Sequence, residues 1–550
     1  MSNQMTGGQA IVATLVSEGI DTIFGLPGVQ LDNTFDALYM ARNTIRTIHT
    51  RHEQGAGYMA MGYAQASGKV GACIVGPGPG LLNTSAAIAT ASGSNAPVLC
   101  IAGQLPTSQI GGGMGMTHEI RDQTAAMRGV AHWVGRAETA AAAPEVLREA
   151  FRQMLGERHQ PVIVEMSPDV MGNLEDVTLL QPEDFLHDPT VPESAVEDAA
   201  RLLGQAKNPA IFVGSGGFGA EAELLELAEL LQAPVIMSRT ARGVLSDRHY
   251  LAQSIIGGQE LWPEIDVAIA VGTRFSGPGL TWGRENDVKI IRIDIDAEQA
   301  AKPRPAAVCF VAQAKTALAA LAPRVASYNR KRSSREAEMQ AVKRVVAEKL
   351  EALQPQFSFA TVIRDALPDD GIMVTDVTQL GSFLQNWMPV YHPRTVITPG
   401  YQATLGMGLP TAIGAKVACP DKKVLCVSGD GGFMFNVQEL STAVANNIDL
   451  VVIVFNDGAY GNVKRYQKEL YDGRYIGVDL HNPDFVMLAK SFGMTGLKAE
   501  TPEELGTALK QAFATDGPAL IEVPLGEVPS VWKLINRPSQ STGPTDGKSS

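Results

Sequence analysis

The sequence has few cysteines, and none of them stands in a CxxC or other metal-ligand spacing. The five are Cys73, Cys100, Cys309, Cys419 and Cys426. They are scattered, and three lie inside apolar runs, which argues against a disulfide framework or a structural zinc site. We therefore expect buried free thiols in a reducing cytoplasm.

Long apolar runs and positive charge are also lacking. No window of about 20 apolar residues predicts a membrane span. The first residues, "MSNQMTGGQAIVATLV", have neither the basic region nor the cleavage site of a signal peptide. The formal net charge is −13 and no basic stripe occurs, so we expect neither nucleic acid nor a membrane as partner. The charge favours no particular substrate.

What the chain does contain is a regular alternation of strand and helix patterns. Its 550 residues, 45% of them hydrophobic, are too many for one core and predict roughly two to four domains. The β-branched runs are "GACIV", "PVLCIAG", "PVIVEM", "NPAIFVG", "DVAIAVG", "KIIRIDI", "IMVTD", "KVLCV" and "LVVIVF". Strands that are apolar on both faces and separated by helices are typical of parallel sheets in α/β proteins.

Two changes in composition suggest where domains end. A Pro- and acid-rich stretch predicts a linker near 168–192, and a charged helical stretch predicts a second linker near 325–355. Three doubly wound α/β domains of ordinary size remain. We expect these at residues 1–168, 192–325 and 355–530, followed by a disordered tail at 531–550.

The first and third blocks share a plan. Each has a helical stretch that contains Met-Gly, a cysteine-containing strand, a Gly-rich turn, a helix and a second strand. The turn reads "GPGPG" in the first block and "SGDGG" in the third. The pattern favours a duplication, although the general alternation of α/β folds could also produce it.

Acidic and glycine residues follow two successive strands of the third block. Asp430 lies in the turn after "KVLCV", and Asn456 and Asp457 lie in the turn after "LVVIVF". Strands of a βαβ unit end at one edge of the sheet, where ligands of open α/β sheets bind. Either turn alone could be an ordinary tight turn. Together, oxygen ligands beside a Gly-rich helix start predict a site for Mg²⁺ and a diphosphate.

These two turns resemble the motif of thiamin-diphosphate-dependent enzymes. The resemblance implies three metal ligands, namely Asp430, the side chain 27 residues later, Asp457, and the main-chain carbonyl of Ala459. The family usually has Asn at the second position, so Asn456 is the alternative ligand. "IFGLPGVQLDNTFDAL", "TRHEQGAGYMAMGYAQASGKVG" and "GYQATLGMGLPTAIGA" are similar to acetolactate synthase and relatives such as benzoylformate decarboxylase.

The resemblance implies a domain order and an assembly. The order is a pyrimidine-binding, a central and a diphosphate-binding domain. The assembly is a homodimer or a dimer of dimers whose active sites form between subunits.

The resemblance also assigns catalytic residues to the first block. Glu53, in "RHEQGAG", matches the acid that hydrogen-bonds the aminopyrimidine ring and favours its imino form, which takes the proton from thiazolium C2. A glutamate at a helix start could also simply interact with the helix dipole. Gln104 matches an active-site glutamine of acetolactate synthases. His118 lies near the active-site histidines of the decarboxylases and could donate a proton, or it could be a surface or capping residue.

Further cofactor contacts are implied in the third block. Leu405 matches the aliphatic side chain that bends the cofactor into a V shape, unless it is an ordinary core residue. Ala403 matches the residue whose carbonyl accepts a hydrogen bond from the 4′-amino group. The residues expected beside the diphosphate are Thr378, Gln379, Gly431 and Gly432.

The central block departs from acetolactate synthases that carry FAD. Gly-rich turns such as Val213–Gly217 are weak signals of a dinucleotide, and the stretch like "GMHG" is absent, so bound FAD is doubtful. Pro278 stands near the position of the arginine that holds the second 2-oxo acid, and Tyr466 replaces the specificity tryptophan. Arg274 and Arg284 lie nearby and could replace the arginine.

We therefore predict thiamin-diphosphate- and Mg²⁺-dependent decarboxylation of a small 2-oxo acid, with protonation or carboligation of the enamine. The alternatives are a true acetolactate synthase or a flavin-linked 2-oxo acid oxidase. A further alternative from another class is a non-catalytic protein that binds nucleotide diphosphates.

Overall fold

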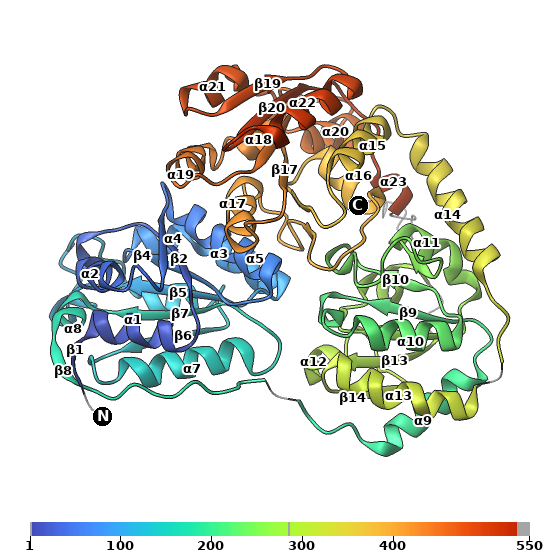
Figure 1. Ribbon diagram of the computed structural model, residues 1–550, viewed down its shortest axis with the longest axis horizontal. Helices are drawn as coiled ribbons and strands as arrows, with labels where there is room; N and C mark the ends of the chain where they lie inside the picture. The colour runs from blue at the N-terminus through green and yellow to red at the C-terminus, as the bar shows by residue number, and fades with distance from the viewer. Residues whose placement is uncertain (1–2, 187, 284–286, 330, 536–550) are drawn as a thin grey trace, which may run out of the picture. The chain divides into compact units, whose positions relative to one another are not determined.

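The computed structural model describes residues 3–186, 188–283, 287–329 and 331–535. The chain forms two compact units (Figure 1). The first unit contains Met1–His187, Val362–Gly381 and Val396–Glu527, and the second contains Asp188–Thr361, Ser382–Thr395 and Val528–Ser550. Among the described helices, none is long and apolar enough to cross a membrane.

The N-terminal sheet of the first unit has six parallel strands in the order β3-β2-β4-β5-β7-β6. Its strands are β2 (Thr22–Gly25), β3 (Arg46–His49), β4 (Gly71–Val75), β5 (Val98–Gly103), β6 (Trp133–Ala137) and β7 (Val162–Met166). Side chains alternate between its two faces. Ala72 and Ile74 pack with helices α1 (Gly7–Ser17) and α7 (Ala143–Leu155), whereas Cys73 and Val75 share a core with α3 (Glu53–Ser67) and α5 (Ser85–Ser94).

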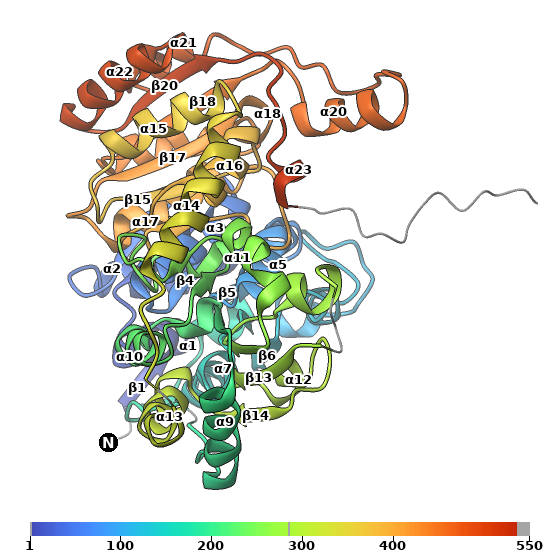
Figure 2. The same cartoon turned by 90° about the vertical axis from the view of Figure 1, so that its right-hand side faces the viewer.

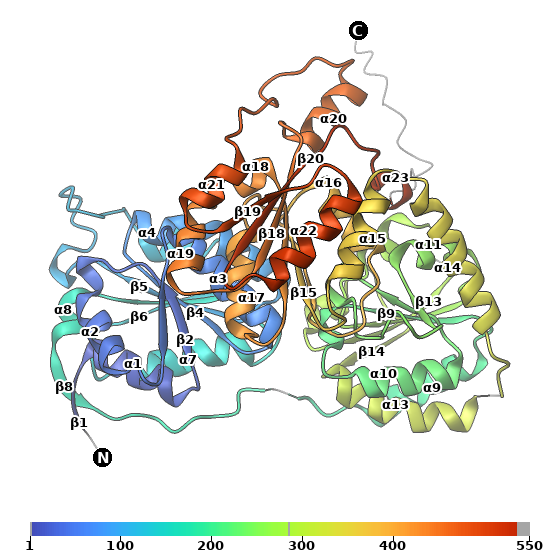
Figure 3. The ribbon, with the colours of Figure 1, turned by 45° about the horizontal axis from the view of Figure 1, so that its top comes forward.

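A second sheet of the first unit repeats this order with later strands, as β16-β15-β17-β18-β20-β19. The strands are β15 (Ile372–Thr375), β16 (Val396–Ile397), β17 (Val424–Gly429), β18 (Val451–Asn456), β19 (Thr495–Lys498) and β20 (Ala519–Pro524). Helices α21 (Phe485–Ser491) and α22 (Pro502–Ala514) lie against β19 and β20 (Figure 3). Strands β15 to β20 thus take the places of β2 to β7, which supports the shared plan inferred from the sequence.

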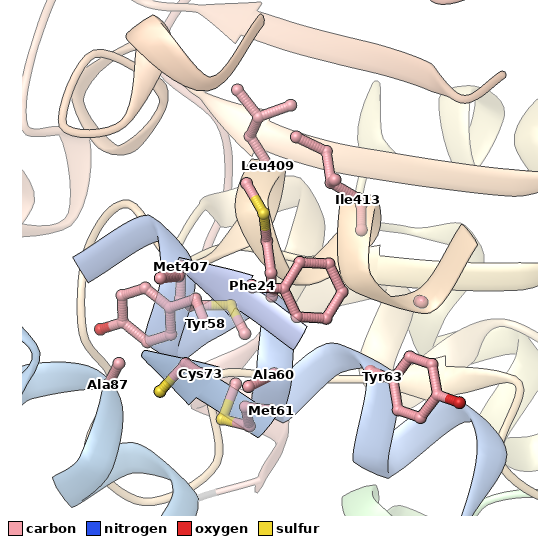
Figure 4. Packing of buried hydrophobic residues seen from close by; sticks show 14 of the residues in the cluster. Phe24, Tyr58, Ala60, Met61, Tyr63, Cys73, Ala87, Met407, Leu409 and Ile413 are labelled. Carbon is pink, nitrogen blue, oxygen red and sulfur yellow. The ribbon is translucent and has the colours of Figure 1, made fainter. Parts of the chain in front are cut away.

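Helices α3 and α17 (Gly408–Ala418) hold these two sheets together within the first unit. A Cβ atom on Gly62 of α3 would lie 2.1 Å from the Thr411 carbonyl oxygen of α17, and one on Gly414 would lie 1.9 Å from the Met59 carbonyl oxygen of α3. Buried side chains such as Tyr58, Met407 and Ile413 surround this contact (Figure 4). The two helices therefore pack with their backbones in direct contact.

The second unit contains one parallel sheet in the order β11-β10-β9-β12-β13-β14. Its strands are β9 (Pro209–Val213), β10 (Val235–Met237), β11 (Ala252–Gln253), β12 (Val267–Val271), β13 (Lys289–Asp294) and β14 (Val308–Val311). Helices α9 (Glu193–Gln205) and α13 (Ala314–Tyr328) lie side by side in this unit (Figure 2). The three sheets confirm the predicted class of doubly wound α/β domains.

All nine apolar runs named from the sequence are strands, and the charged stretch before residue 355 contains helix α14 (Glu336–Glu351). The expected linker at 168–192 begins instead with α8 (Pro168–Gly172) and β8 (Leu174–Val177), and β8 pairs antiparallel with β1 (Asn3–Thr6). The expected disordered tail begins with α23 (Trp532–Ile535), and residues 536–550 lie outside the described residues.

The cysteine prediction was partly wrong. All five thiols are free, and Cys73, Cys100 and Cys426 are buried. Cys309, however, is exposed and Cys419 is only half-buried. Cys309 lies on β14, the edge strand of its sheet in the described part of the chain.

Candidate active site

The two acidic turns of the third block lie side by side. Strands β17 and β18 are parallel neighbours, and Gly429 at the end of β17 pairs with Phe455 near the end of β18. Asp430 and Asn456 are the residues that follow this pair. The sequence prediction that both turns face one space at the carboxyl edge of the sheet is therefore confirmed.

A cavity of about 260 Å³ opens at this edge. Its lining comes from the turn after β15, the loop before α17, the turn after β17, the turn after β18 with the residues that follow it, and Leu525 after β20. Its lining includes all nine residues that the sequence assigned to the metal and to the cofactor in the third block, which are Thr378, Gln379, Ala403, Leu405, Asp430, Gly431, Gly432, Asp457 and Ala459.

Asp430 and Asp457 form an acidic pair in this cavity. Asp430 is buried, and burial together with the Asp430 carboxylate raises the pKa of Asp457 to about 7. Within the described part of the chain, neither carboxylate makes an ion pair with Lys, Arg or His. A buried carboxylate beside a half-buried one suits a divalent cation, which prefers oxygen ligands.

The hydrogen bonds around this pair favour Asp457 over Asn456 as a metal ligand. The Asn456 side-chain amide donates to Glu522 Oε1 at 2.8 Å, and its oxygen accepts from Asn482 Nδ2 at 2.9 Å. Both ends of the Asn456 side chain are therefore occupied. Asp457 instead lines the cavity, and its Oδ1 accepts from the nearby Ala459 N–H at 3.2 Å.

Asp430 is held by two donors on one oxygen. Its Oδ2 accepts from Gly458 N–H at 2.9 Å and from Asn482 Nδ2 at 2.5 Å. These bonds fix the orientation of the carboxylate at the cavity. No described group of three or more His, Cys, Asp or Glu side chains could hold a metal, so the expected site depends on two carboxylates and the Ala459 carbonyl.

The glycines after Asp430 leave room along the backbone of α18 (Asp430–Phe433). A Cβ atom on Gly431 would lie 2.9 Å from the Tyr460 ring, and one on Gly432 would lie 3.1 Å from the Asp376 carboxylate. Glycine at both positions therefore lets Tyr460 and Asp376 approach the start of α18 closely, beside the cavity.

Asp376 connects three segments that line the cavity. Its fully buried carboxylate accepts from the N–H groups of Val377 and Gly408 and from the Ser428 hydroxyl. Burial raises the pKa of Asp376, and these hydrogen bonds oppose the shift. The turn that carries Thr378 and Gln379 is thereby fixed next to the start of α17 and the end of β17.

The loop before α17 brings Ala403 and Leu405 to the cavity. Ala403 has a positive φ of 49°, which turns the chain sharply, and Leu405 is half-buried. Leu405 is therefore not a fully buried core residue, and it lines the cavity.

Among the described residues, those that line the cavity do not include Glu53, Gln104 or His118. Glu53 is the first residue of α3 and is half-buried, and its Oε2 accepts from Asn83 Nδ2 at 3.0 Å. Gln104 is buried and donates to Glu165 Oε2 at 3.3 Å. His118 is exposed and has a φ of 68°.

The structure also describes two of the residues that the sequence linked to the second 2-oxo acid. Tyr466 lies on α20 (Gly461–Leu470) and is 49% exposed. Pro278 is buried in the segment Gly277–Thr281 of the other unit. Arg284 lies outside the described residues.

Sequence reasoning missed Asn482 and Asp376. Asp376 stands directly before Val377 in "TDVTQ", so its place after a strand was a usable signal. Asn482 lies 52 residues from Asp430 in an irregular segment. No local pattern predicts that contact.

Three family models together match most of the chain. Residues 5–126 match the "Thiamine pyrophosphate enzyme, N-terminal TPP binding domain", residues 196–321 the "central domain", and residues 376–523 the "C-terminal TPP binding domain". The order agrees with the one implied by the sequence resemblance.

Similar proteins cover nearly the whole length. The chain is 33% identical to the probable acetolactate synthase large subunit of Methanococcus aeolicus, over 97% of this chain and 95% of that protein. It is 31% identical to the acetolactate synthase isozyme 1 large subunit of Escherichia coli, over 97% and 96%. It is also 33% identical to the probable 2-ketoarginine decarboxylase AruI of Pseudomonas aeruginosa, over 94% of each chain.

Proposed function

Because the chain belongs to the thiamine pyrophosphate enzyme family, we propose that it decarboxylates a small 2-oxo acid with the help of Mg²⁺, followed by protonation or by carboligation to a second carbonyl compound. The observation that carries this proposal is the cavity in which Asp430, Asp457 and the Ala459 segment meet Thr378 and Leu405. Relatives include both acetolactate synthases and a probable 2-ketoarginine decarboxylase.

In the proposed site, Asp430, Asp457 and the carbonyl of Ala459 hold Mg²⁺. The N–H groups of Gly431 and Gly432, with Thr378 and Gln379, bind the diphosphate. When bound, thiamin diphosphate supplies a carbon nucleophile and an electron sink for the loss of CO₂. Leu405 and the carbonyl of Ala403 fix the orientation of the cofactor rings.

Glu53 is proposed to hydrogen-bond the pyrimidine and thereby activate C2 by proton transfer. Gln104 is proposed to contact the substrate, and His118 to donate a proton to the product. These three residues do not line the described cavity, whose volume of about 260 Å³ is below the ~300–1,000 Å³ usual for a small-molecule site. Both observations support a site that a second subunit completes, in a homodimer or a dimer of dimers.

The remaining parts of the proposal concern domains, flavin and location. We propose a pyrimidine-binding domain at 1–168, a central domain at 192–325 and a diphosphate-binding domain at 355–530. The proposal does not include FAD as a cofactor, because the central block departs from the acetolactate synthases that carry FAD. A cytoplasmic location is supported by the five free cysteines.

Product analysis tests the proposal. Purified protein with thiamin diphosphate and Mg²⁺ is given a panel of 2-oxo acids, with and without an added aldehyde, and CO₂ release and the carbon product are measured. We expect CO₂ release that depends on both thiamin diphosphate and Mg²⁺. A protein that binds thiamin diphosphate but releases no CO₂ from any acid of the panel would contradict the proposal and favour a non-catalytic binding protein.

A further inference from the structure

Glu439 is a completely buried carboxylate that the proposed chemistry does not use. It ends the short helical segment η7 (Val437–Glu439), nine residues after Asp430. Its two oxygens accept from the backbone N–H of Arg51 at 3.1 and 3.2 Å, and Oε2 also accepts from the Thr442 hydroxyl at 2.6 Å. Burial raises the pKa of Glu439, and these hydrogen bonds oppose the shift.

The carboxylate lies against the first turn of α3. A Cβ atom on Gly55 would be 2.5 Å from Glu439 Oε1, so a larger residue at position 55 would collide with it. The first turn of a helix has unpaired N–H groups and a partial positive charge, which favour an acidic group at this place. Glu439 thus fixes the backbone that leads into Glu53, the first residue of α3.

A second contact from the same segment holds the residue after Glu53. Asn436 Nδ2 donates to Gln54 Oε1 at 3.2 Å and to the Gly406 carbonyl at 2.7 Å. Gly406 follows Leu405 in the loop that lines the cavity. The segment Asn436–Glu439 therefore holds both the residues before Glu53 and the residue after it. The Glu53 carboxylate itself accepts from Asn83 instead.

We propose that Glu439 is a positioning residue for Glu53, which it orients through the Arg51 N–H and the first turn of α3. This inference rests on the proposed role of Glu53 as the group that activates the cofactor. Because a displacement of about 1 Å can cost a catalytic step roughly 100-fold, a change at Glu439 should slow C2 deprotonation even though Glu439 does not touch the cofactor.

The test compares Glu439→Gln with the wild type in three measurements. These are amide hydrogen exchange at residues 46–60 of the cofactor-free protein, the affinity for thiamin diphosphate with Mg²⁺, and the rate of C2 hydrogen–deuterium exchange in the bound cofactor. We expect faster amide exchange at the start of α3 and C2 exchange slowed by about tenfold or more. The affinity should change by less than about threefold, because the proposed metal and diphosphate contacts remain.

Two further variants distinguish a positioning effect from a general loss of stability and from a failure of the proposed role of Glu53. Val452→Ala removes buried methyl groups from β18 in the same unit and should lower stability without slowing C2 exchange. Glu53→Gln reports on the proposed function itself. If Glu53→Gln slows C2 exchange and Glu439→Gln leaves it within about twofold of the wild type, the positioning role is wrong and the proposed function stands. If Glu53→Gln has no effect, the proposed function fails.

Where Glu439→Gln does not fold, Glu439→Asp takes its place. The shorter acid keeps the charge but cannot reach the Arg51 N–H in the same geometry, so the same slowing of C2 exchange is expected. Unchanged amide exchange at α3 together with unchanged C2 exchange in this variant would overturn the inference.

Discussion

Gly62 and Gly414 occupy equivalent places on two helices that touch each other. Gly62 of α3 faces the Thr411 carbonyl and Gly414 of α17 faces the Met59 carbonyl, so each glycine lies over the residue three positions before the other. The same strand order in the two sheets places α3 and α17 between corresponding strands. The paired glycines are therefore a product of the repeated plan, and they allow the two halves of the first unit to share one core.

Gly62→Ala and Gly414→Ala should each destabilise the protein. The added methyl group would lie about 2 Å from a backbone oxygen, and overpacking of this kind costs about 1–3 kcal/mol. Denaturant unfolding of the purified variants measures the loss. Gly93→Ala on α5 is the matched control, because its Cβ would have its nearest contact at 3.5 Å. If Gly93→Ala lowered the free energy of unfolding as much as Gly62→Ala does, the close packing of α3 against α17 would not explain the effect.

The metal ligands can be tested by substitution. Asp430→Ala should abolish Mg²⁺-dependent binding of thiamin diphosphate, whereas Asp457→Asn should be tolerated, because Asn keeps an oxygen ligand and removes the repulsion from Asp430. Titration of the cofactor at several Mg²⁺ concentrations gives both affinities. Equal loss in the two variants would show that Asp457 is not a ligand of the kind proposed.

Asn482 should support the metal site indirectly. Asn482→Ala removes the donor that joins Asp430 to Asn456, and loss of a partner of a metal ligand typically costs about 10–100-fold in metal affinity. We expect a Mg²⁺ affinity lowered by about tenfold. His481→Ala, at the exposed neighbouring residue, serves as control. An unchanged affinity in Asn482→Ala would contradict the role.

Much of the fold could be predicted because apolar runs and turns are local signals. The sequence also predicted that the turns at Asp430 and Asp457 face one space, because the ends of parallel strands meet at one edge of a sheet. The contacts of Glu439 with Arg51 and of Asn482 with Asp430 join segments far apart in the sequence, and no periodicity reports them. The pairing of β1 with β8 was missed because a Pro- and acid-rich stretch has the composition of a linker.

The second substrate gives a further prediction. Burying a carboxylate without a cationic partner is costly. The sequence resemblance implies that Pro278 and Tyr466 stand near the positions of an arginine and a tryptophan in acetolactate synthases. If pyruvate is a donor, we expect mainly acetaldehyde, or acetoin when acetaldehyde is added. Quantifying acetolactate, acetaldehyde and acetoin decides between these outcomes. Acetolactate as the dominant product would contradict this prediction and indicate a true acetolactate synthase.

A site shared between subunits predicts complementation. Asp430→Ala and Glu53→Gln should each give inactive homodimers, but a mixed dimer would contain one site with both residues intact. The two variants are unfolded, mixed in equal amounts and refolded together. Roughly half of the dimers should then be mixed, each with one intact site of two, so about a quarter of the wild-type activity should return. No recovery, with mixed dimers shown to form, would mean that both residues act within one chain.

The role of Glu53 in activating the cofactor is the central claim, and C2 hydrogen–deuterium exchange of bound thiamin diphosphate tests it most directly. Glu53→Gln keeps the size of the side chain and its position at the start of α3, so the fold and the cofactor affinity should be retained. The account predicts C2 exchange at least about 100-fold slower than in the wild type, since a group that transfers the proton is lost. An exchange rate equal to that of the wild type, in a variant that still binds the cofactor, would contradict it.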